Sequence, residues 1–287
     1  LPAKCPQLVR WGRKMNNHND GIEEIPRDQA DPLTFAIARR DRSVLSTVRT
    51  ALRHGNVALA YQPVLQARGR HQVAFYEGLI RIFDETGRII PAKDFIHVVE
   101  GSETGRLIDC AALELGLKTL DNTPHIRLSL NLSARSIGYP KWMRILRKAL
   151  MRNPRIGERL ILEITESSAM LIPELVSSFM TKMRYHGISF ALDDFGAGHT
   201  SFRYLKDFLF DILKIDGQFA QNVSQDADNQ VLTYALIAIA KQMDMLTVAE
   251  QIETVQDAEW IEKSGIDCVQ GYFYSAPTIR PPWSLPN

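Results

Sequence analysis

The segment from Ser189 to Asp216 combines residue types that could bind a metal ion. A short apolar run ends in two adjacent carboxylates, Asp193 and Asp194, which are followed by a glycine-containing turn, and Lys214 comes later in a second apolar run. One Asp would suffice to cap the next helix. Two adjacent carboxylates repel each other, so the pair favours a bound cation, although the capping interpretation stays open.

Polar residues also occur near the ends of the other apolar segments that we predict to be strands. In parallel strands these ends share one edge of the sheet, so we expect the side chains to converge. A buried group of carboxylates needs cations, and oxygen ligands of this kind suit Mg²⁺ or Mn²⁺. The absence of Cys and His from the set argues against a structural zinc site. The residues are Glu77, Asn131, Glu163, Glu166, Asp193, Asp194, Lys214, Glu250 and Gln270.

Each of these residues also has a structural interpretation when it is considered alone. Glu77 could lie on the surface of an edge strand, Asn131 could form an Asx turn or a helix cap, and Lys214 could pair with Asp216. Glu163 and its neighbour Glu166 could both point outward. A polar residue at the same end of so many strands favours one shared site over many separate accidents.

Strands and helices alternate along the chain from Val57 onward, which indicates a parallel sheet. The first two strands are separated by a turn at residues 68–70, which is too short for a crossover helix, so they should be antiparallel. We therefore predict an α/β fold, a modified (β/α)8 TIM-type barrel with an antiparallel first strand. The predicted strands are 57–61, 73–83, 126–132, 160–164, 189–192, 211–215, 246–250 and 268–274. The predicted helices are 33–54, 91–99, 107–120, 142–150, 174–185, 231–243 and 255–263.

Composition sets broader limits on the function. The 287 residues are 45% hydrophobic and 23% charged, and the formal net charge of +1 argues against DNA or RNA as a polymeric partner. Cys5, Cys110 and Cys268 match no zinc spacing and suggest reduced thiols in a cytoplasmic protein. We expect residues 1–32 to form an N-terminal arm or linker and residues 33–283 to form the barrel domain.

The chain starts at Leu1 rather than Met, so we expect that it could be a fragment of a longer protein. No apolar run approaches the roughly 18 residues of a membrane span. A sensor or membrane segment could then lie outside this sequence.

A series of short motifs resembles the EAL-domain cyclic di-GMP phosphodiesterases. The resemblance covers about Leu33 to Pro277 and is specific, because many separated motifs agree in order and spacing. The motifs are YQPV, EGLIR, LNLSA, LEITES, LDDFGAG, LKID, VAEQIET and QGYFYSAP.

This resemblance implies that the protein hydrolyses one phosphodiester of cyclic di-GMP to give linear 5′-pGpG, with two Mg²⁺ or Mn²⁺ ions. It implies that one metal would be bound by Glu77, Asn131, Glu163 and Asp193. Asp193 would bridge to a second metal that Asp194 and Glu250 also bind.

The resemblance implies roles for further residues around the metals. Lys214 would orient or help to activate the attacking water, and Glu250 is one candidate for the general base. Glu166 would hold the loop that follows Asp194. The implied substrate contacts are Gln62, Leu79, Arg81, Asp216, Glu253 and Gln270, of which Arg81 would contact a phosphate and Gln270 could instead support the metal waters.

Three positions depart from the family pattern. The signature Glu-Ala-Leu contains Gly78 here, the usual Gly after the strand-seven Glu is Gln251, and a position that is often Thr is Ala197. Gln251 could crowd the substrate or alter the geometry of its loop.

Because all metal positions are retained, we favour an active enzyme over two alternatives. The first is a catalytically weak or inactive cyclic di-GMP receptor, and the second is a scaffold that uses the fold for dimerisation. Family dimers commonly pair near the helix after the DDFG loop, so a homodimer is plausible.

Overall fold

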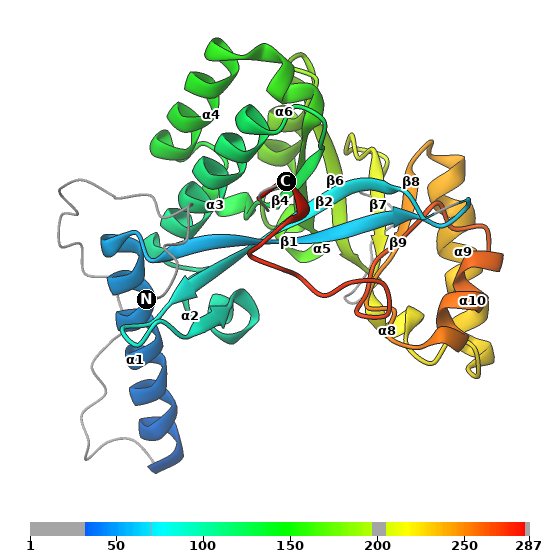
Figure 1. The fold of residues 1–287 in the computed structure, drawn as a ribbon, viewed down its shortest axis with the longest axis horizontal. Coiled ribbons are helices and arrows are strands. Elements are labelled where there is room, and N and C mark those ends of the chain that lie inside the picture. Colours follow the sequence, from blue (N-terminus) through cyan, green and yellow to red (C-terminus); the bar gives the residue numbers. More distant parts are fainter. Residues whose placement is uncertain (1–31, 70, 197–204, 285–287) are drawn as a thin grey trace.

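The computed structural model describes residues 32–69, 71–196 and 205–284. The predicted N-terminal arm therefore lies almost wholly outside the described residues and stays a prediction. The first described helix, α1 (Pro32–His54), contacts α3 and β2 at the margin of the barrel. The first turns of α1 extend away from the barrel (Figure 1). Among the described residues, no helix is both long and apolar enough to cross a membrane.

A sheet that closes into an eight-stranded barrel forms the centre of the molecule and confirms the predicted fold class. Around the barrel the order is β1-β9-β8-β7-β6-β5-β4-β2, and β1 pairs back onto β2. The parallel ladder runs from β2 through β4 to β9, whereas β1 is antiparallel to both of its neighbours, as predicted. The strands are β1 (Val57–Gln66), β2 (Val73–Phe83), β3 (Ile89–Pro91), β4 (Leu128–Asn131), β5 (Leu160–Thr165), β6 (Ser189–Phe195), β7 (Ile212–Ile215), β8 (Leu246–Ala249) and β9 (Cys268–Val269).

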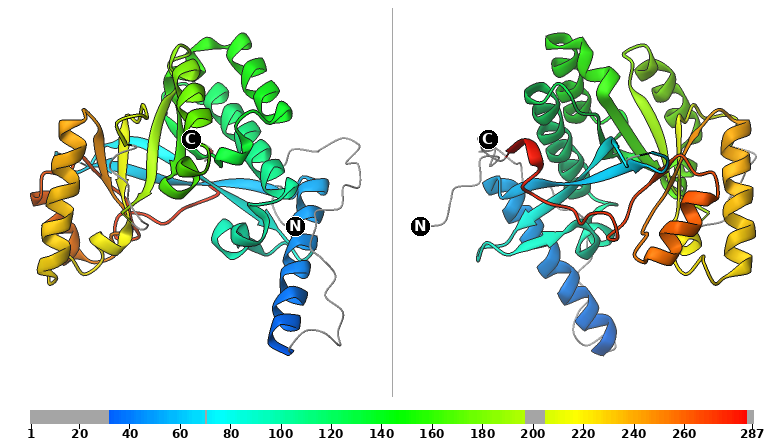
Figure 2. Two further views of the ribbon diagram at one scale, coloured as in Figure 1. Left: turned by 180° about the vertical axis from the view of Figure 1, so that it is seen from behind. Right: turned by 45° about the vertical axis from the view of Figure 1, so that its right-hand side comes forward.

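Helices pack on the outside of the barrel, in the described connections between its parallel strands. The helices α3, α4 and α6 cover one side, while α9 and α10 lie on the other side (Figures 1 and 2). Besides α1, the α-helices are α2 (Ile96–Val99), α3 (Glu103–Asn122), α4 (Pro140–Arg152), α5 (Glu166–Leu171), α6 (Pro173–Arg184), α8 (Gly217–Ala220), α9 (Ala227–Gln242) and α10 (Val255–Lys263). The 3₁₀ turns are Ala92–Asp94, Ala134–Ser136, Pro154–Arg159 and Pro282–Ser284.

Several predicted bounds differ from the structure by a few residues, and two predicted elements are interrupted by the local backbone. Residues 91–99 do not form one helix, because Pro91 ends the edge strand β3 and Phe95, with a φ of −138°, separates a 3₁₀ turn from α2. The last strand ends at Val269 rather than at Tyr274. The chain turns at Gly271, where a Cβ atom would lie 2.0 Å from the carbonyl oxygen of Ile252, so the backbones pack directly on each other.

The interior of the barrel has an apolar layer beneath a polar layer. The apolar layer is a separate buried cluster formed by Val64, Phe75, Ile161, Ala191, Ile212, Val248 and Cys268. Side chains two residues apart on a strand share a face. On every parallel strand except β4, the residue two positions further along the chain from this cluster is polar, and on antiparallel β1 the polar residue lies two positions earlier. These residues are Gln62, Glu77, Glu163, Asp193, Lys214, Glu250 and Gln270, and all of them are buried.

Candidate active site

Lys214 lies at the centre of the polar layer. It is 1% exposed, and its Nζ atom lies 2.8 Å from Glu163 Oε2, 2.9 Å from Asp193 Oδ1, 2.8 Å from Glu250 Oε1 and 3.8 Å from Glu77 Oε2. The four carboxylates come from β2, β5, β6 and the end of β8. Lys214 therefore pairs with these four carboxylates and not with Asp216.

Glu77 is held by two side-chain amides. Asn131 Nδ2 donates to Glu77 Oε1 at 3.2 Å, and Gln270 Nε2 donates both to Glu77 Oε2 at 2.7 Å and to Gln62 Oε1 at 3.1 Å. Glu77 is 6% exposed, so it is not a surface residue. It also lies in the middle of β2 rather than at its end, because β2 continues past the barrel to pair with β1 and β3.

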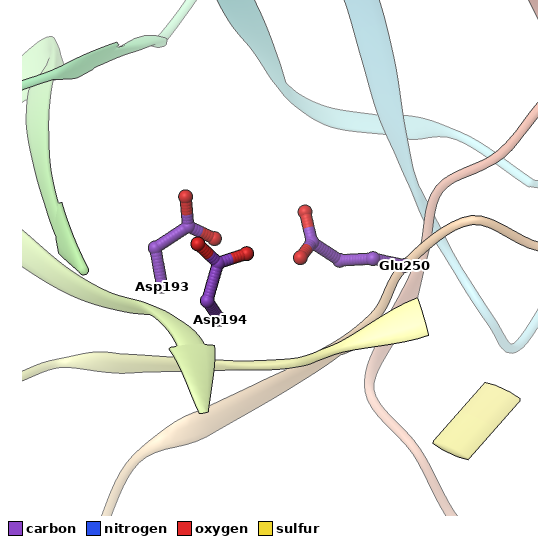
Figure 3. Close-up of side chains that lie close together, drawn as sticks. All are labelled: Asp193, Asp194 and Glu250. Atoms are coloured by element: carbon purple, nitrogen blue, oxygen red, sulfur yellow. The ribbon is translucent and has the colours of Figure 1, made fainter. Parts of the chain in front are cut away.

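A local irregularity in β6 brings Asp194 into the site. Strand alternation would point Asp194 away from Asp193, but the register of β6 with β7 shifts at this point and Asp194 has a φ of +53°. Asp tolerates this left-handed conformation, and such bulges commonly redirect a side chain. As a result, one carboxylate oxygen from each of Asp193, Asp194 and Glu250 lies within 4.8 Å of the others (Figure 3).

Glu166 lies behind this irregularity and contacts the chain just after it. It is the first residue of α5 and is buried, and its Oε2 accepts a hydrogen bond from the backbone N–H of Gly196 at 3.3 Å. Gly196 has a φ of +94°, and a Cβ atom there would lie 2.5 Å from the ring of Phe219. This contact agrees with a role for Glu166 in fixing the path of the chain after Asp194.

Burial and mutual repulsion shift the titration of the cluster. Burial raises the pKa of Glu163 to about 8, although the neighbouring Lys214 opposes the shift. Burial and the adjacent Asp193 raise the pKa of Asp194 to about 6, and burial raises the pKa of Glu250 well above its ordinary value. Burial alone would lower the pKa of Lys214, but the surrounding carboxylates raise it well above its ordinary value.

The residues present fit a pair of divalent cations. When ionised, the carboxylates of Glu77, Glu163, Asp193, Asp194 and Glu250 carry five negative charges against the one positive charge of Lys214, so two divalent ions would balance the remainder. In addition, Oε1 of Glu163 is buried without a hydrogen-bond partner among the described residues. Carboxylate and amide oxygens are the donors that Mg²⁺ and Mn²⁺ prefer.

The predicted substrate contacts lie around this cluster at different depths. Gln62 and Gln270 belong to the buried polar layer, and Gln62 Nε2 also donates to the carbonyl of Ser275 at 3.0 Å. Leu79 and Arg81 are half-buried on β2 beyond Glu77. Burial lowers the pKa of Arg81, while Glu77, Tyr272 and Asp94 oppose that shift.

The remaining two predicted contacts, Asp216 and Glu253, lie nearer to solvent. Asp216 follows β7 directly and caps α8, since its Oδ1 accepts a hydrogen bond from the N–H of Gln218 at 2.8 Å. The exposed Glu253 lies in the loop between β8 and α10. The structure therefore gives Asp216 a capping role besides any contact with a ligand.

Two departures from the family pattern have a local explanation. A Cβ atom on Gly78 would lie 2.8 Å from Cδ2 of Leu130, so the side chain of Leu130 fills the space that an alanine would occupy. Gln251 has a φ of +53°, and its side chain lies across Gly217. The third departure, Ala197, falls outside the described residues.

Sequence reasoning did not identify three residues that the structure places beside the site. Ser275 binds Gln62 through its backbone carbonyl, Tyr272 influences the titration of Arg81, and Gln221 donates a hydrogen bond to Gln251. A backbone acceptor leaves no signal in the side-chain sequence. Gln221 is thirty positions from Gln251, so only the folded chain brings the two together.

Comparison with known proteins defines the class of the chain. Residues 45–277 match the EAL domain, so the chain belongs to the EAL domain family. It is 28% identical over 235 residues to the probable cyclic di-GMP phosphodiesterase PdeN of Escherichia coli, covering 80% of this chain and 45% of PdeN. It is also 28% identical over 239 residues to the cyclic di-GMP phosphodiesterase PdeF of the same organism, covering 82% of this chain and 32% of PdeF. The chain thus spans less than half the length of these curated relatives.

Solved structures support the same assignment. The FimX EAL domain from Pseudomonas aeruginosa bound to c-di-GMP has a TM-score of 0.75 at 25% identity, over 82% of this chain and 96% of that chain. The PaMucR phosphodiesterase in complex with c-di-GMP has a TM-score of 0.71 at 27% identity, over 82% of this chain and 97% of that chain.

Proposed function

We propose that this chain is a metal-dependent phosphodiesterase that hydrolyses cyclic di-GMP to linear 5′-pGpG in bacterial second-messenger signalling. The observation that carries the proposal is the group of five carboxylates around Lys214, with Asp193, Asp194 and Glu250 placed to share a cation. The family membership and the named activity of relatives such as PdeF support it.

In this proposal the carboxylates of Glu77, Glu163, Asp193, Asp194 and Glu250, together with Asn131, would hold two Mg²⁺ or Mn²⁺ ions. When bound, such ions lower the pKa of a coordinated water and offset charge on the attacking and leaving oxygens. Glu77 would be kept in position by Asn131 and Gln270, which hold its two carboxylate oxygens. Glu250 is one candidate for the general base, because its carboxylate lies beside Lys214 and shares the cation site with Asp193 and Asp194.

Lys214 would orient the attacking water and stabilise the developing negative charge. Its ammonium is fully buried and fixed by carboxylates from neighbouring strands, so its position would cost little reorganisation during the reaction. Arg81 would contact a substrate phosphate, and Gln62, Leu79, Asp216, Glu253 and Gln270 would contact the remainder of cyclic di-GMP. Glu166 would act through the chain after Asp194, by holding the N–H of Gly196.

The main alternative is a cyclic di-GMP receptor with little or no turnover. The strained conformation of Gln251, next to Glu250, is the observation that favours it. We also propose a cytoplasmic location and a homodimer. The matched relatives are longer than this chain, and we propose a sensor domain outside it for that reason. The segment expected to mediate dimerisation, after the DDFG loop, lies largely outside the described residues, so this expectation stays a prediction.

One assay separates these functions. The protein is incubated with cyclic di-GMP and Mn²⁺, and the products are separated from the substrate by chromatography. Formation of linear pGpG supports the enzyme, whereas binding of cyclic di-GMP without a product supports the receptor. Neither binding nor turnover would leave the scaffold as the remaining interpretation.

A further inference from the structure

Gln251 is held in an unfavourable backbone conformation beside the metal-binding cluster. Its φ of +53° is left-handed, a region that glycine, asparagine and aspartate enter far more readily than glutamine. The residue follows Glu250 directly, and the flanking Ile252 is fully buried and bonded through its N–H to the carbonyl of Gln270. A strained residue at such a place persists only when its surroundings fix it.

The side chain of Gln251 lies along the short helix α8, which begins at Gly217. A Cβ atom added to Gly217 would lie 2.4 Å from Cδ, 2.5 Å from Oε1 and 2.7 Å from Cβ of Gln251, so the glutamine occupies that space. At the other end of α8, Gln221 Nε2 donates a hydrogen bond to Gln251 Oε1 at 3.1 Å. The contact therefore spans the whole of α8.

This contact joins the same two strand ends that the ion pairs join inside the barrel. Helix α8 follows β7, which carries Lys214, and Gln251 follows β8 and Glu250. Inside the barrel, Glu250 Oε1 lies 2.8 Å from Lys214 Nζ. The side chain of Gln251 is thus directed onto α8.

We propose that Gln251 is a positioning residue that fixes the loop after β8 to α8, and so keeps the Glu250 carboxylate at the metal site. This inference rests on the proposed function, because it assigns a cation to Asp193, Asp194 and Glu250. Gly217 is needed for this contact, since only a residue without a side chain leaves room for Gln251. Gln221 is the second part, because it fixes the end of the Gln251 side chain.

The test measures Mn²⁺ affinity by isothermal titration calorimetry, and melting temperature without metal, for the whole chain. Gln251→Gly relieves the backbone strain and removes the contact, so we expect an unchanged or higher melting temperature together with a Mn²⁺ Kd about three- to tenfold weaker. If the contact only stabilised the fold, its loss would lower both the melting temperature and the Mn²⁺ affinity.

Two further variants check the mechanism without changing Gln251. Gln221→Ala removes the hydrogen bond, and Gly217→Ala displaces the glutamine side chain. Each should weaken Mn²⁺ binding in the natural background and have no further effect when combined with Gln251→Gly. Additive effects, or an unchanged Mn²⁺ affinity in Gln251→Gly, would overturn the inference.

Glu250→Gln separates this inference from the proposed function. If Glu250→Gln weakens Mn²⁺ binding but the Gln251, Gln221 and Gly217 variants do not, only the positioning role fails. If Glu250→Gln also leaves Mn²⁺ binding unchanged, Glu250 is not a metal ligand, and both the inference and the metal assignment fail.

Discussion

The Nζ atom of Lys214 lies 2.8 Å from Oε2 of Glu163, and both side chains are at most 1% exposed. This pair forms the centre of a polar layer that rests on the apolar layer of the same barrel. A buried ammonium among carboxylates can stabilise the fold, serve the chemistry, or do both. The predictions below separate these roles.

Lys214→Met should lower kcat about a hundredfold, equivalent to roughly 3 kcal/mol of transition-state stabilisation, with a modest change in cyclic di-GMP affinity. The substitution should also lower the melting temperature in EDTA, because the carboxylates lose their cation. Adding Mn²⁺ should reduce the difference in melting temperature between the variant and the natural protein. Both quantities are measured on one preparation. A normal kcat together with a lowered melting temperature would show that Lys214 is only structural.

Glu77→Ala should reduce turnover at least a hundredfold while the protein stays folded. The change removes a proposed metal ligand and frees the amides of Asn131 and Gln270, which can bind water instead. Glu85→Ala, in an exposed turn after the same strand, is the matched control and should keep full activity. Circular dichroism checks the fold, and near-normal turnover of Glu77→Ala with Mn²⁺ would refute the metal assignment.

Stabilisation by Mn²⁺ should grow as the pH rises from 6 to 8. The folded-state pKa values of Glu163 and Asp194 are raised, to about 8 and about 6, so at low pH protons compete with the metal. Raised carboxyl pKa values also mean that the metal-free fold binds protons more tightly than the unfolded chain does. Its stability should therefore fall over this pH range.

Differential scanning fluorimetry with EDTA and with Mn²⁺ at each pH tests both trends. A shift on adding Mn²⁺ that does not vary with pH would contradict the proposed ligands.

Asp109→Asn should raise the melting temperature more at pH 8 than at pH 5, where only part of the penalty is present. Burial raises the pKa of Asp109 to about 7, although hydrogen bonds from the Ser136 hydroxyl and the Ser133 N–H oppose the shift. The carboxylate is thus an unfavourable form in the fold, and its penalty begins near the ordinary pKa of 3.8, grows as the pH rises and is complete above about 7. An amide oxygen can accept the same two hydrogen bonds. Equal effects at both pH values would contradict this explanation.

Much of the fold follows from local pattern, because short and nearly continuous apolar strands alternate with helical segments along the chain. The predicted strand 73–83 and helix 255–263 agree with the structure at both ends. The antiparallel first strand follows from the length of the turn at residues 68–70. Chain reversals set by packing could not be predicted, and Gly271 against Ile252 is one example.

The candidate site could be predicted as a set of residues but not as a geometry. A bulge in β6 directs the side chain of Asp194 to the same site as that of Asp193. The sequence shows only that the two carboxylates are adjacent. The sequence also could not show that Lys214 would prefer Glu163 over Asp216, because the choice depends on which face of β7 lies inside the barrel. The hydrogen bond between Gln221 and Gln251 joins distant segments and exists only in the folded chain.

The most direct test of the central claim is to follow cyclic di-GMP by chromatography after the protein has been stripped with EDTA and supplied with Mn²⁺, Mg²⁺ or Ca²⁺. We predict linear pGpG with Mn²⁺ or Mg²⁺, little with Ca²⁺ because its longer and looser coordination misplaces the attacking water, and none in EDTA. Full turnover without metal, or tight binding of cyclic di-GMP with no pGpG in the presence of Mn²⁺, would contradict the assignment as a metal-dependent phosphodiesterase.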